Sequence, residues 1–175
     1  MPDLIAQLTP SVPALRRYAR SLVHDRAAAD DLVQECLERA IARWGQRRGD
    51  GDARTWLFAI LHNLAMSQLR QRRRRGPHLS LDELEPASAM RPATQEHSVQ
   101  HAELLRVLAR LSDDHRAVLL LVAVEDLSYA EAARVLDVPV GTVMSRLSRA
   151  RDSLSALLAD DDPKRAPRPA LRRLK

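Results

Sequence analysis

The chain has 175 residues, with 28 Lys and Arg against 23 Asp and Glu, and its net charge of +5 favours negatively charged partners. A single cysteine, Cys36, excludes an intramolecular disulfide and fits a reducing, cytoplasmic setting, where we expect it to be a small buried side chain. We find no secretory signal and no apolar run near 18 residues, so membrane insertion is not expected.

Composition and periodicity together predict an all-α protein. Aromatic residues make up only 3% of the chain, so its core should be aliphatic and rich in alanine, and neither half shows the alternation of a strand. We expect two small helical domains, 1–76 and 101–160, joined by a flexible linker over 77–100. A short basic tail follows at 161–175.

The first helical block, from about Val12 to Arg75, has a central helix over 27–42 with two different faces. One face should be buried and holds five side chains: Val33, Leu37, Ala40, Ile41 and Trp44. The opposite face carries four polar side chains at intervals of three and four residues: Asp31, Gln34, Glu35 and Glu38. Such a polar face, taken alone, is most often simply solvated.

Residues 45–52 (GQRRGDGD) contain three glycines and no apolar side chain, and they predict an exposed loop. Asp52 can cap the next helix, which ends in a run of arginines from Arg70 to Arg75. The apolar residues of that helix are Trp56, Leu57, Ile60, Leu61, Leu64 and Leu69. Trp44 and Trp56 could stack on bases, but core packing is the favoured interpretation.

The segment 77–100 has three prolines and a mild negative charge, which is typical of a linker. The second block begins near His101 with a helix over 103–111. Ser112 is expected to cap another helix over 113–124, whose last six residues, LLLVAV, should be buried.

A helix-turn-helix is predicted over 127–151. Ser128 and Glu131 have the spacing of a capping box, and Asp137 to Pro139 should break the first helix. The buried side chains are expected to be Ala132, Ala133, Leu136, Val143 and Leu147. Five side chains of the second helix should face outward, where hydroxyls and arginines suit phosphates and base edges in a major groove: Thr142, Ser145, Arg146, Ser148 and Arg149. The alternative is an ordinary helical hairpin with a solvated basic face.

Three stretches resemble one family, the bacterial sigma-70 type RNA polymerase sigma factors of the extracytoplasmic-function (ECF, group IV) class. ADDLVQECLERA at 29–40 resembles the region-2 helix that binds the polymerase clamp. GDGDARTWLFAILHNLAMSQLRQRRRR at 49–75 is similar to the part that opens and reads the promoter −10 element. SYAEAARVLDVPVGTVMSRLSRAR at 128–151 is similar to the region-4 helix-turn-helix that binds the −35 element.

The resemblance implies roles for the polar residues already described. Core polymerase would contact the acidic face of Asp31, Gln34, Glu35 and Glu38. Promoter DNA at −10 would contact Arg47, Arg48, Gly49 and Asp50 in the loop, which helps to capture an extruded base in this family, and Asn63 and Arg70 on the next helix. The −35 element would meet Thr142, Ser145, Arg146, Ser148 and Arg149. The chain departs from common family residues at His62, Ser67 and Met144.

The resemblance therefore implies an alternative sigma factor, active in a stress response and controlled by an anti-sigma factor. A two-domain regulator that binds duplex DNA is the runner-up, although the acidic helix and the glycine-rich loop with arginines in the first block argue against a sensing domain. A nucleic-acid enzyme has little support, because the six histidines have no metal-ligand spacing and no phosphate-binding glycine loop precedes a lysine. We expect no catalytic residue, metal, cofactor or small-molecule substrate.

Overall fold

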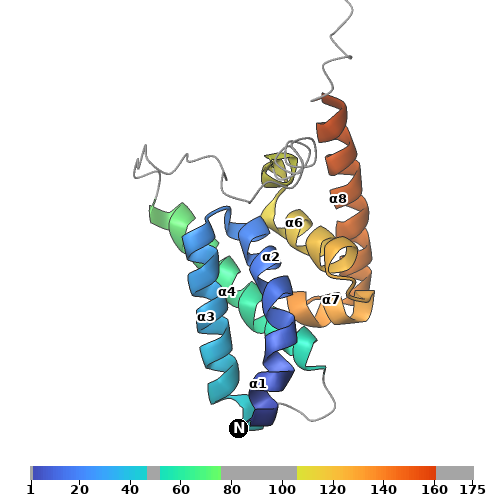
Figure 1. The fold of residues 1–175 in the computed structure, drawn as a ribbon. Helices are drawn as coiled ribbons and strands as arrows, with labels where there is room; N and C mark the ends of the chain where they lie inside the picture. Colours follow the sequence, from blue (N-terminus) through green and yellow to red (C-terminus); the bar gives the residue numbers. More distant parts are fainter. Residues whose placement is uncertain (1, 47–51, 76–105, 161–175) are drawn as a thin grey trace, which may run out of the picture.

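A computed structural model describes residues 2–46, 52–75 and 106–160, and every regular element within those ranges is helical (Figure 1). The all-α prediction is confirmed. The first block contains α1 (Pro2–Leu8), a 3-10 turn η1 (Thr9–Ser11), α2 (Val12–Val23), α3 (Arg26–Ala42), a 3-10 turn η2 (Trp44–Gln46) and α4 (Ala53–Arg75). The second block contains a helical stretch over 106–110, α6 (Asp113–Leu119), a π-helical turn η4 (Leu120–Val124), α7 (Tyr129–Leu136) and α8 (Val140–Asp160).

Short polar side chains start several of these helices. The Asp25 carboxylate accepts a hydrogen bond from the Ala28 amide (2.9 Å) at the start of α3. Asp52 accepts one from the Thr55 amide (3.1 Å), as predicted, and Ser112 accepts one from the His115 amide (3.3 Å). Each of these bonds satisfies an amide that has no partner inside the first turn of its helix.

The first block packs around Tyr18 and Phe58, which are both fully buried with their rings edge to face and 5.4 Å between centroids. Two features differ from the sequence-based expectation. Helix α1 and the turn η1 precede Val12, where no element was predicted. The prediction that Ile41 is buried is wrong, because this side chain is 49% exposed.

The position of Ile41 has a simple geometric cause. It lies three residues after Glu38 and seven after Gln34, so it follows the outward face of α3 rather than the buried one. Val33 and Ala40 are buried as predicted, while Leu37 and Trp44 are half-buried at the edge of the core.

The second block buries the predicted side chains of the helix-turn-helix, with Ala132, Val143 and Leu147 each at 2% exposure or less. The predicted burial of residues 119–124 is correct for the first half only. Leu119 to Leu121 are buried, but Val124 is 39% exposed. The π-helical turn accounts for the change, because its wider backbone winding shifts the positions of side chains from the ordinary helical period.

The two blocks pack directly against each other, with α4 against α7 and α2 against both α6 and η4 (Figure 1). Arg116 joins them from inside the core at 4% exposure. Its guanidinium donates to the carbonyls of Leu108 (2.8 Å) and Leu111 (2.8 Å) in the second block and of Leu22 (3.1 Å) in the first. The predicted linker and basic tail lie outside the described residues.

Replacing Arg116 with Ala should lower the free energy of unfolding by about 3 kcal/mol or more, because buried carbonyls lose their donor and a cavity remains. Chemical denaturation followed by circular dichroism measures the change. Arg106→Ala is the control, since Arg106 is exposed and its loss should cost at most about 0.5 kcal/mol. Equal denaturation midpoints for the two variants would contradict this role of Arg116.

Candidate DNA-binding and polymerase-binding surfaces

The predicted capping box is present at the start of the helix-turn-helix. The Glu131 amide donates to the Ser128 hydroxyl oxygen (3.3 Å), and the Ser128 amide donates to the Glu131 carboxylate (2.8 Å). Hydrogen bonds from the side chain and then the backbone of Ser128 lower the pKa of Glu131. The carboxylate therefore stays charged to a lower pH than an ordinary glutamate, and the capping box that starts α7 persists with it.

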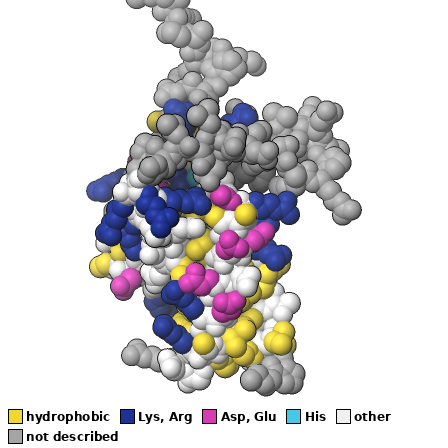
Figure 2. Space-filling view, turned by 90° about the vertical axis from the view of Figure 1, so that its left-hand side faces the viewer, with side chains coloured by type: hydrophobic (Ala, Val, Ile, Leu, Met, Phe, Trp, Pro, Cys, Tyr) yellow, Lys and Arg dark blue, Asp and Glu magenta, His cyan; other side chains and the backbone are white. Residues whose placement is uncertain are grey.

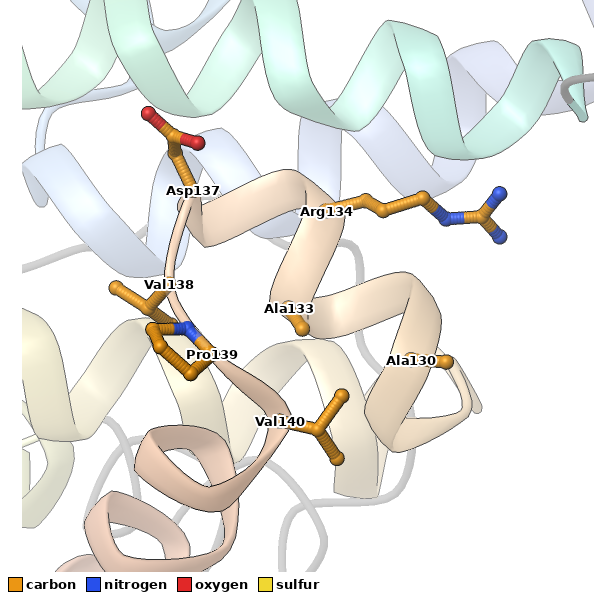
Figure 3. Close-up of a pocket in the computed structure, with 7 residues that line it drawn as sticks. All are labelled: Ala130, Ala133, Arg134, Asp137, Val138, Pro139 and Val140. Atoms are coloured by element: carbon orange, nitrogen blue, oxygen red, sulfur yellow. The ribbon is translucent and has the colours of Figure 1, made fainter.

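The turn between α7 and α8 has the geometry that its residues predict. Asp137 adopts the left-handed conformation (φ 53°), and its amide donates to the Ala133 carbonyl. The Pro139 carbonyl then accepts hydrogen bonds from the amides of Thr142 (2.9 Å) and Val143 (3.2 Å), which starts α8. The turn borders an open groove of about 480 Å³ lined by Ala130, Ala133, Arg134, Asp137, Val138, Pro139 and Val140 (Figure 3).

Helix α8 presents the outward face expected of a recognition helix. Ser145, Ser148 and Arg149 are exposed, opposite the buried Val143 and Leu147. The remaining two predicted contact residues, Thr142 and Arg146, are only half-exposed.

Arg146 already has a partner, because its guanidinium lies 3.2 Å from the carboxylate of Asp114 on α6. Met144 is 53% exposed and Val140 is 42% exposed, so apolar surface borders the polar face of α8. Of the two predicted contact arginines of α8, Arg149 is therefore the more accessible, whereas Arg146 is held by its ion pair with Asp114.

On α3, the predicted acidic face is accessible. Asp31, Gln34 and Glu38 are exposed, and the Gln34 amide donates to Glu38 (3.0 Å). Glu35 is half-exposed and pairs with Arg39 one turn later. Figure 2 views the molecule from the side on which α3 lies in Figure 1, and it shows acidic side chains among arginines, with hydrophobic side chains towards the lower end.

Helix α4 places Asn63 and Arg70 on the surface two turns apart. The arginines that follow are partly engaged: Arg72 lies 3.8 Å from Asp25, and Arg73 pairs with Asp113 of the second block. The predicted loop residues Arg47, Arg48, Gly49 and Asp50 lie outside the described residues.

Four other residues of interest lie within the first block. His62 is 7% exposed, and its Nδ1 shares a hydrogen bond of 3.0 Å with the Tyr18 hydroxyl; burial lowers the His62 pKa to about 4. Burial likewise raises the pKa of the Cys36 thiol to about 12, in agreement with its predicted structural role. The half-buried rings of Trp44 and Trp56 pack edge to face at 6.0 Å between centroids.

Sequence reasoning missed one charged group of three residues. Glu125, which is 1% exposed, accepts two hydrogen bonds from Arg17, at 2.8 and 2.7 Å, and lies 3.5 Å from the guanidinium of Arg54. Arg17 and Glu125 are 108 residues apart, so no local pattern could have paired them.

Within the described residues, no group of His, Cys, Asp and Glu could hold a metal ion, and no helix is long and apolar enough to cross a membrane. The described helices present three exposed surfaces: an acidic face on α3, polar and basic positions along α4, and the polar face of α8 on a capped helix-turn-helix. These features are those of a helical protein with a helix-turn-helix of the kind that binds DNA.

Comparison with known proteins identifies the family. Residues 8–62 match the model "Sigma2 domain of PhyR", and residues 101–154 match "Sigma-70, region 4". The chain is 38% identical over 154 residues to the ECF RNA polymerase sigma factor EcfG of Rhodopseudomonas palustris, covering 86% of this chain and 82% of that protein. It is 38% identical over 149 residues to the ECF sigma factor SigC of Mycobacterium tuberculosis, covering 79% and 73%.

Among solved structures, the chain is similar to the sigma factor RpoE of Bartonella quintana, determined in complex with the anti-sigma factor NepR. The TM-score is 0.77 at 34% identity, and the match covers 92% of this chain and 99% of that one. The chain belongs to the ECF sigma factors of RNA polymerase.

The two arginines of α8 should behave differently in DNA binding. Arg149→Ala should relax the preference at one base pair of the −35 element, because an exposed guanidinium can reach a base edge. Arg146→Ala should weaken binding to all sequences and flatten its salt dependence by about one unit, as expected for a lost phosphate contact. Titration of wild-type and single-substituted duplexes separates the two effects. Unchanged promoter preference in both variants would refute the assignment of α8 as the recognition helix.

Proposed function

We propose that the two blocks of this sigma factor have different binding functions. The first block, 1–76, binds core RNA polymerase through the acidic face of α3 and reads and opens the −10 element. The second block, 101–160, binds the −35 element with the outward face of α8. Polymerase and chromosome occupy the bacterial cytoplasm, and the chain acts there.

The observation that best supports this proposal is the accessible polar face of α8 on a capped helix-turn-helix. Hydroxyls at Ser145 and Ser148 and the cation at Arg149 are the groups that bind phosphates and base edges in a major groove. The known relatives are transcription initiation factors, and we assign no catalytic activity to this chain.

The spacing of the two promoter elements requires the blocks to separate. Elements centred near −10 and −35 lie about 85 Å apart along the helix axis, at about 3.4 Å per base pair. A compact chain of this length has a radius of gyration of about 16 Å, so packed blocks cannot contact both elements. The predicted linker over 77–100, fully extended, spans about 80 Å, which is sufficient once the size of the blocks is added.

An anti-sigma factor is the regulator that the relatives suggest. RpoE of Bartonella quintana was determined in complex with NepR, and CnrH in complex with the cytosolic domain of CnrY. We propose that this chain is held inactive by a protein of the same class. A general stress response is the setting that we infer for its release.

Replacing both Asp31 and Gln34 with Ala should weaken association with core polymerase by about 1–3 kcal/mol, the scale of lost charge-assisted hydrogen bonds. The fold should survive, because both side chains are exposed. Co-purification and titration with core polymerase measure the effect. Asp152→Ala with Ser155→Ala is the control, since it removes an exposed acid and a polar group at the same spacing from α8. Equal affinity of both double variants would exclude this face of α3.

Rigidifying the predicted −10 loop by Gly49→Pro and Gly51→Pro should prevent promoter opening while leaving polymerase association and −35 binding largely intact. A loop that holds a flipped base needs backbone freedom that proline removes. Permanganate reactivity of thymines in the bubble reports opening, and a pre-melted promoter should restore part of the activity. Normal opening by the variant would exclude the loop. If the wild-type chain with core polymerase opened no promoter, the chain would instead fit a duplex-binding regulator.

A further inference from the structure

Two guanidinium groups of the first block converge on a single carboxylate of the second. Arg17 of α2 binds Glu125 as a fork, with its Nε donating to one carboxylate oxygen (2.8 Å) and its Nη2 to the other (2.7 Å). From the start of α4, the Arg54 guanidinium donates to the Glu125 carbonyl (2.7 Å) and lies 3.5 Å from the carboxylate. The acceptor is almost wholly buried at 1%, whereas the Arg17 and Arg54 side chains are 52% and 39% exposed.

The two arginines remain together when the blocks separate, because α2 and α4 pack against each other within the first block. Arg54 is also held in place by its own block. Its amide donates to Asp52 (3.2 Å), and its guanidinium lies 5.4 Å from the centroid of the Phe58 ring. When Glu125 leaves, Arg17 and Arg54 remain as two neighbouring cations that repel each other and have lost their carboxylate partner.

We infer that Arg17 and Arg54 form a binding site for a phosphodiester group of single-stranded promoter DNA, and that Glu125 occupies this site in the closed chain as a phosphate mimic. An arginine fork fits carboxylate and phosphate oxygens equally well. Arg54 also directly follows the proposed −10 loop in the sequence, so the site borders the place where the strand is expected to separate. This inference rests on the proposed role of the first block in opening DNA.

A further ion pair between the blocks has the same character. Arg73 at the end of α4 pairs with Asp113. An acidic group of the second block thus covers positive charge of the first here too. When promoter binding separates the blocks, the arginines of the first block lose these carboxylates. A nucleic-acid strand is then present to pair with them.

The test uses the full chain with Glu125→Gln, which keeps the shape of the side chain and removes its charge. Binding to a single-stranded oligonucleotide of about 20 nucleotides is measured by fluorescence anisotropy over a series of salt concentrations. We expect binding about tenfold tighter than wild type at low salt and a salt slope steeper by about 0.7 units, for one additional phosphate contact. In the triple variant Arg17→Gln, Arg54→Gln, Glu125→Gln, this gain should vanish.

Asp30→Asn is the matched control, because it removes the same charge from a carboxylate that pairs with two arginines, Arg16 and Arg20, within the first block. It should change the affinity less than twofold. A gain no larger in Glu125→Gln than in this control would overturn the inference, and so would an undiminished gain in the triple variant.

A second measurement keeps Glu125 in place, in case its replacement prevents folding. Arg17→Gln with Arg54→Gln, assembled with core polymerase, should form open promoter complexes about tenfold more weakly, with a flatter salt dependence. Arg16→Gln, at the neighbouring exposed arginine that lies 3.6 Å from Asp30, should leave them unchanged. Equal complexes for the two variants would overturn the inference while leaving the sigma function intact. Failure of the wild-type chain to open the promoter would refute the proposed function instead.

Discussion

The arrangement of this sigma factor depends on the contact between its two blocks, which is both apolar and charged. The buried side chains of both blocks form one continuous core, and around it the buried Glu125 and Arg116 each reach across to the other block. Burying a charge costs free energy unless it is paired, and these two groups are fully engaged only while the blocks stay together. The contact is therefore specific in geometry and sensitive to anything that competes for the charges.

The basic end of α4 has different partners in the closed and the open chain. Arg73 lies on α4, a helix that we assign to DNA, yet in the closed chain it pairs with Asp113 at the start of α6. The promoter is a polyanion and can replace such carboxylates, with counterion release adding to its affinity.

The features that were predicted correctly from the sequence are those determined by residues close together in the chain. Caps at Asp52, Ser112 and Ser128 and the buried positions Val143 and Leu147 follow from spacing within a single helix, and the structure agrees. Ile41 was misplaced because its apolar side chain was given more weight than its position, although its spacing from Gln34 and Glu38 puts it on the polar face of α3.

The contact between blocks could not be predicted from local patterns, since Glu125 meets Arg17 across 108 residues of sequence. A charged residue after an apolar helix is ordinarily solvent-exposed, and only the tertiary fold buries it. The polymerase-facing and DNA-facing assignments came from resemblance to a family. The structure adds which of those side chains are accessible and which already have partners.

Separation of the blocks is the central physical claim, and a distance between them tests it most directly. Cysteines introduced at the exposed positions Ala27 and Ser155 can carry fluorescent or spin labels, while the buried Cys36, with its pKa raised to about 12, should react slowly. In the free chain the labels should lie within the dimensions of a compact fold, with a radius of gyration of about 16 Å. In the open promoter complex the distance should increase towards the roughly 85 Å between the two elements. The same short distance in both states would contradict the account.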